Sequence, residues 1–179
     1  KNQKIYKNFT SLENIEFLKK KICNFKIEKV KDIDWCFCII NRKKFKKTKI
    51  LDENFFMYFE TTDLCKKLDR LKHKMFIIKG LKFRHLGTSS SHKKFNNEIS
   101  INRNWHFSWS KFYFFRKNQN YTYALKKIIP NVYKNTIGIL ISLVKINLFD
   151  ARLNLASLMG ALNGIFLRKS SYRINLKND

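Results

Sequence analysis

The chain has 179 residues, which is enough for one domain with a hydrophobic core. Its 44% hydrophobic and 15% aromatic content excludes an intrinsically disordered protein. Lysine and arginine outnumber aspartate and glutamate by 38 to 13, and the resulting net charge of +25 favours an anionic partner. Part of this excess reflects the joint abundance of Lys, Asn, Ile and Phe, which is typical of an AT-rich genome.

The N-terminal half is predicted to contain strands on either side of a helix. Residues 1–31 are rich in lysine and show only a weak helical pattern. The apolar run 33–40 is typical of a mostly buried strand, and residues 41–49 of a basic turn or short helix. Residues 63–72 form the clearest helix because leucines recur at i, i+4 and i+7, and residues 75–79 form a short strand. This order predicts an α/β layer.

The second half is predicted to be helical. Residues 103–117 combine aromatic and basic side chains, and Trp105 and Trp109 share one helix face. That face is either a core stripe or a belt at a membrane interface. Residues 121–167 continue as helix, punctuated by Pro130 and Asp150. Their apolar stretches fall short of the ~20 residues of a membrane span, so we expect core or interfacial helices.

The four cysteines are Cys23, Cys36, Cys38 and Cys65, and only Cys36 and Cys38 are closely spaced. No second pair with zinc spacing follows. We therefore expect reduced thiols in a cytoplasmic core.

Four acids surround the aromatic run 55–59, and they are Asp52, Glu53, Glu60 and Asp63. Acids beside buried aromatic side chains cost free energy unless they have a role. Asp63 either favours the N-terminus of the following helix, with Thr61 or Thr62 as its cap, or belongs to a site. Glu60 follows a predicted strand and can serve as a general base.

His85 precedes a run of small hydroxyl residues that includes Ser89 and Ser90. A buried core histidine explains His85 as well as a functional one does. In the functional reading, His85 contacts a metal or phosphate, and the serine hydroxyls and loop amides help to hold anionic oxygens.

Four segments, in this order, resemble family 2 glycosyltransferases, which are inverting enzymes of GT-A fold. Residues 52–65 (DENFFMYFETTDLC) resemble the motif FDE-x-FF-x-Y-x-ED-x-DL-C of that family. Trp35 and Arg42 resemble its W-x-x-G…R segment, and residues 85–90 resemble H-x-G-x-S-S. Residues 104–114 resemble the aromatic and basic helix that follows in bacterial members.

The resemblance implies roles for individual residues. Glu60 lies in the acidic pair that supplies the catalytic base, but Thr61 replaces its usual Asp, so the role passes to Glu60, passes to Asp63 or is lost. We favour Glu60. His85 matches a metal-coordinating histidine of some members, and Trp35 lines a sugar or acceptor pocket. The expected substrate-binding residues are Trp35, Ser89, Ser90 and Lys111.

The resemblance also implies a divided organisation. Residues 1–117 would form the acceptor side of a partial GT-A domain, and residues 118–179 a helical, membrane-associated region. Family members begin with a nucleotide-binding half that carries an Asp-x-Asp motif for Mn²⁺ or Mg²⁺. Asp32-Ile-Asp34 comes too late in the order to be that motif. We therefore expect a truncated chain that is inactive alone.

The expected reaction is transfer of a sugar, with inversion, from a nucleotide-diphosphate-sugar donor to a hydroxyl of a saccharide or lipid-linked acceptor. The expected setting is bacterial surface polysaccharide or glycolipid synthesis. The enzyme would be cytoplasmic and peripheral on the inner face of the plasma membrane, bound to its anionic surface, without a nucleic-acid partner. The alternatives are a basic nucleic-acid-binding protein and a non-catalytic peripheral membrane module.

Overall fold

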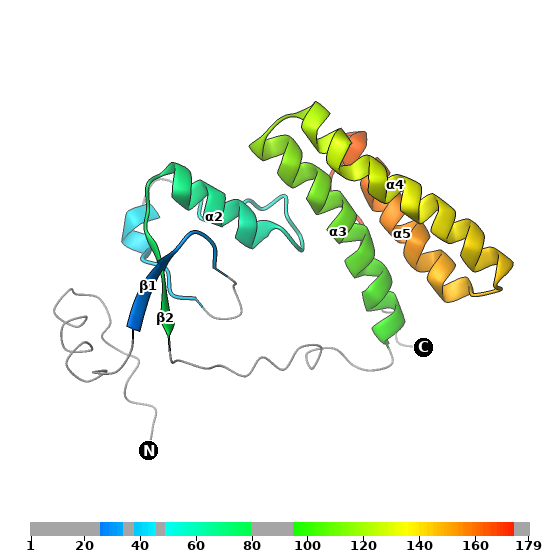
Figure 1. Ribbon diagram of the computed structural model, residues 1–179, viewed down its shortest axis with the longest axis horizontal. Helices are drawn as coiled ribbons and strands as arrows, with labels where there is room; N and C mark the ends of the chain where they lie inside the picture. Colours follow the sequence, from blue (N-terminus) through cyan, green and yellow to red (C-terminus); the bar gives the residue numbers. More distant parts are fainter. Residues whose placement is uncertain (1–25, 34–37, 46–48, 80–94, 174–179) are drawn as a thin grey trace, which may run out of the picture.

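The computed structural model describes residues 26–33, 38–45, 49–79 and 95–173 (Figure 1). This part of the chain contains both α and β structure, in agreement with the coarse prediction of an α/β protein. Its elements in chain order are β1 (Lys26–Val30), the 3₁₀ helix η1 (Arg42–Phe45), α2 (Glu60–Arg70), β2 (Met75–Lys79), α3 (Asn96–Asn118), α4 (Tyr121–Val144) and α5 (Leu148–Ile165).

The three long helices α3, α4 and α5 pack against one another and hold most of the described core (Figure 1). Two clusters of buried side chains join them. The first contains Ile101, Trp105, Trp109 and Ala156, and the second contains Phe112, Ala124, Ile128 and Ala161. Both tryptophans are therefore core residues, and of the two interpretations of the aromatic stripe the core interpretation is confirmed.

Small residues on α5 allow α3 to approach closely. A Cβ atom added to Gly160 would lie 2.1 Å from the backbone oxygen of Trp105, and one added to Gly164 would lie 3.0 Å from the Cβ atom of Phe112. The missing side chain lets α5 contact the backbone of α3 at Gly160 and the ring and Cβ atom of Phe112 at Gly164. The predicted division after residue 117 falls at the last turn of α3, whose packing partners include α4 and α5, and the division itself stays a prediction.

The two described strands form a small antiparallel sheet apart from the three long helices (Figure 1). Their register runs from Lys26 opposite Lys79 to Val30 opposite Met75. The strand 75–79 was predicted, whereas β1 falls in a region for which only a weak helical pattern was noted. All residues of β1 except Val30 are exposed, so burial leaves no alternating pattern to read.

The predicted buried strand 33–40 is wrong for residues 38–40. These residues have no regular structure, and the side chain of Ile39 is 88% exposed. An apolar run alone cannot specify a strand when no neighbouring strand pairs with it. Residues 34–37, with Trp35, lie outside the described part.

Of the two predicted interruptions of the helical half, the one at Pro130 is wrong, because Pro130 lies inside α4. The chain breaks at residues 145–147, just before the second, Asp150. Proline removes one helical hydrogen bond, but Ala124 and Ile128, which precede it in α4, are fully buried in the core and hold the helix in place. Within the described ranges, none of the helices combines the length and the apolar character that crossing a bilayer requires.

Helices α2, α4 and α5 end in the same way. The residue after each C-cap has a left-handed backbone, with φ of 55° at Lys72, 55° at Ile146 and 59° at Leu167. Its N–H and the next N–H donate to carbonyls of the last turn, which is the Schellman arrangement. Glycine normally occupies this position, but the whole chain has only five glycines.

Candidate active site around Glu60

Two left-handed residues precede helix α2. Tyr58 and Phe59 have φ of 66° and 65°, and neither belongs to a helix C-terminus. The left-handed region costs a residue with a bulky side chain of order 1 kcal/mol or more, so two in succession need support from the surrounding structure. The helix begins at Glu60, three residues before the predicted start, and its N-cap is Phe59 rather than a threonine.

Helix α3 supplies that support. The buried hydroxyl of Ser110 donates to the backbone oxygen of Met57 at 2.7 Å. The rings of Tyr58 and Phe59 pack against Phe107, with centroids 5.5 and 5.6 Å apart. Ser110 and Phe107 of α3 therefore fix the turn that precedes α2, and Phe107 belongs to the aromatic run that the sequence pointed to.

Glu60 is the first residue of α2 and is half-buried. Its Oε2 atom is buried and has no hydrogen-bond partner. An unpaired buried carboxylate oxygen carries a desolvation cost that a structural role would offset with a donor. Within the described residues, Asn102 Oδ1 is the other side-chain atom in this situation, and nothing in the structure explains it.

Asp63 has a different environment from Glu60. Its Oδ2 atom lies 2.6 Å from the Nζ atom of Lys117 on α3, and its Oδ1 atom accepts from Asn118 Nδ2 at 2.9 Å. The same Lys117 lies 2.7 Å from Asp52 Oδ2, which also accepts from the hydroxyl of Tyr113 at 2.8 Å. We call these five residues the Lys117 cluster. It joins α2 and the loop before it to α3.

Asp52 and Lys117 of the cluster both favour their charged forms. Burial alone would raise the pKa of Asp52, but hydrogen bonds from Lys117, Asn54 and Tyr113 outweigh it and lower this pKa to about 2. Burial would lower the pKa of Lys117, but its hydrogen bonds to both carboxylates raise it. Asp63 is buried and its carboxylate accepts from Lys117 and Asn118, so it serves to join α2 to α3.

Glu53, the fourth acid around the aromatic run, is exposed. Its carboxylate pairs with Lys49 at 2.9 Å across four residues, and both side chains are about three-quarters exposed. An ion pair of this kind contributes little to stability.

Lys111, a predicted substrate-binding residue, lies on α3 and donates to Asn131 Oδ1 on α4 at 3.0 Å. Burial and the neighbouring Lys127 lower its pKa. Lys111 therefore contacts α4, whereas Lys117 contacts α2, and its predicted role stays a prediction. The other predicted site residues, Trp35, His85, Ser89 and Ser90, lie outside the described residues.

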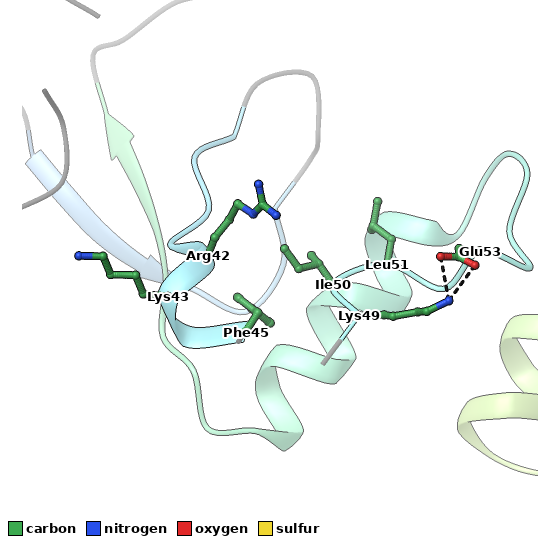
Figure 2. A pocket seen from close by; sticks show the side chains of 7 residues that line it. All are labelled: Arg42, Lys43, Phe45, Lys49, Ile50, Leu51 and Glu53. Atoms are coloured by element: carbon green, nitrogen blue, oxygen red, sulfur yellow. Dashed lines mark hydrogen bonds and ion pairs between the residues drawn. The ribbon is translucent and has the colours of Figure 1, made fainter. Parts of the chain in front are cut away.

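An open pocket of about 640 Å³ lies beside η1 and the chain that leads to Glu53 (Figure 2). Arg42, which belongs to the family resemblance, lines it together with apolar side chains of Ile50 and Leu51. Figure 2 shows the side chain of Lys43 directed away from these residues. The pocket is basic, and neither Glu60 nor Asp63 lines it.

The resemblance places the divalent metal mostly on an Asp-x-Asp motif of the nucleotide-binding half and on His85, which lies outside the described residues. Among them, no three His, Cys, Asp or Glu side chains converge as ligands, and Lys117 occupies the space between Asp52 and Asp63. Both described cysteines, Cys38 and Cys65, are free.

A group that the sequence did not single out lies at His106, which is fully buried. Its Nε2 atom donates to the backbone oxygen of Tyr172 at 2.9 Å, so Nδ1 accepts from Ser170 Oγ at 3.1 Å. Burial lowers the pKa of His106, as does nearby Arg173, against the effect of the Tyr172 carbonyl. A neutral His106 thus holds the segment after α5 against α3. No spacing of residues in the sequence predicts this contact.

The Lys117 cluster was also missed, although a signal for part of it exists. Tyr113 and Lys117 are four residues apart and therefore lie on one face of α3.

Comparison with protein-family models, with curated proteins and with solved structures finds no match for this chain.

Proposed function

We propose that this chain is the acceptor side of an inverting glycosyltransferase in which Glu60 is the catalytic base. The observation that carries the proposal is the unpaired, buried Oε2 atom of Glu60, which follows two left-handed residues. Backbone strain supported by neighbouring elements is concentrated at functional sites in proteins. The four motifs that resemble family 2 glycosyltransferases supply the reaction class.

In the proposed reaction, the acceptor hydroxyl attacks the anomeric carbon of the donor sugar. The carboxylate of Glu60 accepts the hydroxyl proton while the new carbon–oxygen bond forms on the face opposite the diphosphate. The bond between the anomeric carbon and the diphosphate breaks, and its electron pair leaves with the nucleoside diphosphate. Inversion follows because attack and departure occur on opposite faces.

The contrast between the two candidate bases supports Glu60 over Asp63. A base needs an oxygen that is free to accept the hydroxyl proton. Both oxygens of the Asp63 carboxylate already have partners, which are Lys117 and Asn118. A Glu60 oxygen without a partner is free to accept a proton, and Thr61 beside it cannot act as a base near neutral pH.

The donor side of the proposal rests on the resemblance alone. A Mn²⁺ or Mg²⁺ ion held by an Asp-x-Asp motif of a nucleotide-binding half would stabilise the departing diphosphate. We assign no ligand for it among the described residues. The proposed acceptor is a saccharide or lipid-linked hydroxyl compound at the cytoplasmic face of a bacterial plasma membrane.

The reaction class can be tested with the chain joined to such a nucleotide-binding half. The protein is incubated with a panel of nucleotide-diphosphate sugars, Mn²⁺ and a lipid-linked saccharide preparation. We expect nucleoside diphosphate to be released from one donor and the transferred sugar to have the opposite anomeric configuration, measured by NMR. Retention of configuration contradicts inversion. Absence of donor turnover, together with steeply salt-dependent binding of random RNA, favours the nucleic-acid alternative instead.

A further inference from the structure

The turn between α4 and α5 exposes large apolar side chains. Val144 and Ile146 are 85% and 83% exposed, the highest values among the large apolar residues of this hairpin. The exposed apolar residues that we call the hairpin tip are Leu140, Ile141, Leu143, Val144, Ile146 and Leu148. Several large apolar side chains exposed at one turn mark an interaction surface.

Ile146 occupies a position where its own side chain is unfavourable. It is the left-handed residue after the C-cap of α4, with φ of 55°. A β-branched residue is a genuine outlier in this region, and glycine or asparagine would be favoured. Ile146 thus adds an apolar side chain to the hairpin tip at a cost in conformational energy.

The charges around the hairpin tip are mostly basic, and the exception is Asp150, which is exposed in the first turn of α5. Helix α4 and the turn that follows it contain no aspartate or glutamate and carry Lys126, Lys127, Lys134 and Lys145. Lys145 lies within the tip and is exposed, and so is Lys134 on α4. A surface with these charges is complementary to an anionic surface rather than to a second copy of itself.

We propose that the hairpin tip inserts into the interfacial layer of an anionic lipid bilayer. Apolar side chains partition into the boundary between headgroups and acyl chains, and neighbouring lysines attract anionic headgroups. The tip lies at the opposite end of the molecule from the two-stranded sheet (Figure 1). Insertion therefore leaves α2 and Glu60 outside the lipid. This inference uses only the helical half and stands independently of the proposed sugar transfer.

The test replaces Val144 and Ile146 by asparagine together. Asparagine tolerates the left-handed position 146, so this variant is expected to fold. The matched control is Leu167→Asn, which makes the same change at the equivalent exposed left-handed position after α5. The readout is flotation of the 179-residue chain with vesicles of phosphatidylcholine, with or without about 30% phosphatidylglycerol.

We expect wild type and Leu167→Asn to bind the anionic vesicles at least about tenfold better than the neutral ones. The double variant should lose about tenfold in partitioning to anionic vesicles while circular dichroism shows unchanged helix content. Equal binding by the double variant and wild type would mean that surface charge alone holds the protein, and would overturn insertion. The proposal also fails if the wild type does not bind vesicles. If, in addition, light scattering shows that the wild type is a dimer and the double variant a monomer, the tip joins two copies of the chain instead.

Discussion

Lys117 is the residue on which the attachment of α2 to α3 depends. Its ammonium group lies within 2.7 Å of carboxylate oxygens from Asp52 and Asp63, and its side chain is 30% exposed. A cation shared by two largely buried carboxylates neutralises a repulsion that would otherwise separate the elements. Removing it leaves both carboxylates without their main partner.

Lys117→Met is therefore expected to lower the free energy of unfolding at pH 7 by about 2–3 kcal/mol, near the lower end of values for broken buried pairs because the lysine is partly exposed. Urea denaturation followed by circular dichroism measures this change. Lys111→Met is the control, because Lys111 makes one hydrogen bond to a neutral amide and its loss should cost about 1 kcal/mol.

The same variant has a defined pH dependence. In the wild type the pKa of Asp52 is depressed to about 2 from an ordinary value of 3.8. Its contribution to stability is therefore complete above pH 3.8 and is lost as pH falls towards 2. The difference in unfolding free energy between wild type and Lys117→Met should narrow across this range. A difference that stays constant between pH 7 and pH 2 would contradict the assigned role of the cluster.

Among the elements, α5 determines how closely the helical half can pack. Gly160 faces the backbone of Trp105, which cannot move away without shifting α3. Gly138 on α4 would instead direct a Cβ atom at the side chain of Asn154, which can rotate. Both glycines lie inside helices, but a side chain at Gly160 would meet backbone atoms, whereas one at Gly138 would meet a side chain.

Gly160→Ala is expected to destabilise the protein by about 2–4 kcal/mol, because the overlap forces a backbone shift that outweighs the gain of about 1 kcal/mol in helix propensity. Gly138→Ala should change stability by less than about 1 kcal/mol, since propensity and side-chain rearrangement offset each other. Thermal unfolding of the two variants compares them directly. Equal effects would show that the close approach at Gly160 does not limit packing.

The elements that could be predicted are those with a pattern of their own. The leucine spacing of α2, the apolar run of β2 and the aromatic stripe of α3 each specify a structure locally. Strand β1 could not be predicted, because its exposed residues carry no burial pattern and its hydrogen bonds depend on β2. The continuation of α4 through Pro130 also depends on contacts with other helices.

The candidate site was predictable only where it depends on the local sequence. Glu60 could be selected as an acid that follows aromatic residues. The left-handed turn before it could not, because Ser110 and Phe107 of α3 impose the conformation of Tyr58 and Phe59. Glu60 and Asp63 likewise differ in their hydrogen-bond partners only because Lys117 and Asn118, more than fifty residues later in the chain, bind Asp63.

At the scale of the whole molecule, the structure separates two kinds of surface. The N-terminal end of α2, with Glu60, faces α3, and the hairpin tip projects at the far end of the helical half (Figure 1). A protein held at a membrane by the tip could present Glu60 to a lipid-linked acceptor at a fixed distance from the bilayer. The two proposals are compatible, although each can fail without the other.

The central claim is that Glu60 is the base, and the most direct test is the rate of sugar transfer by Glu60→Gln in the chain joined to a nucleotide-binding half of the family that it resembles. We predict a loss of at least about 100-fold in turnover, because general base catalysis contributes about 10²–10⁴-fold. Donor affinity should be unchanged, and the control Glu53→Gln, which alters an exposed glutamate, should retain full turnover. Turnover of Glu60→Gln within a few-fold of wild type would contradict the assignment.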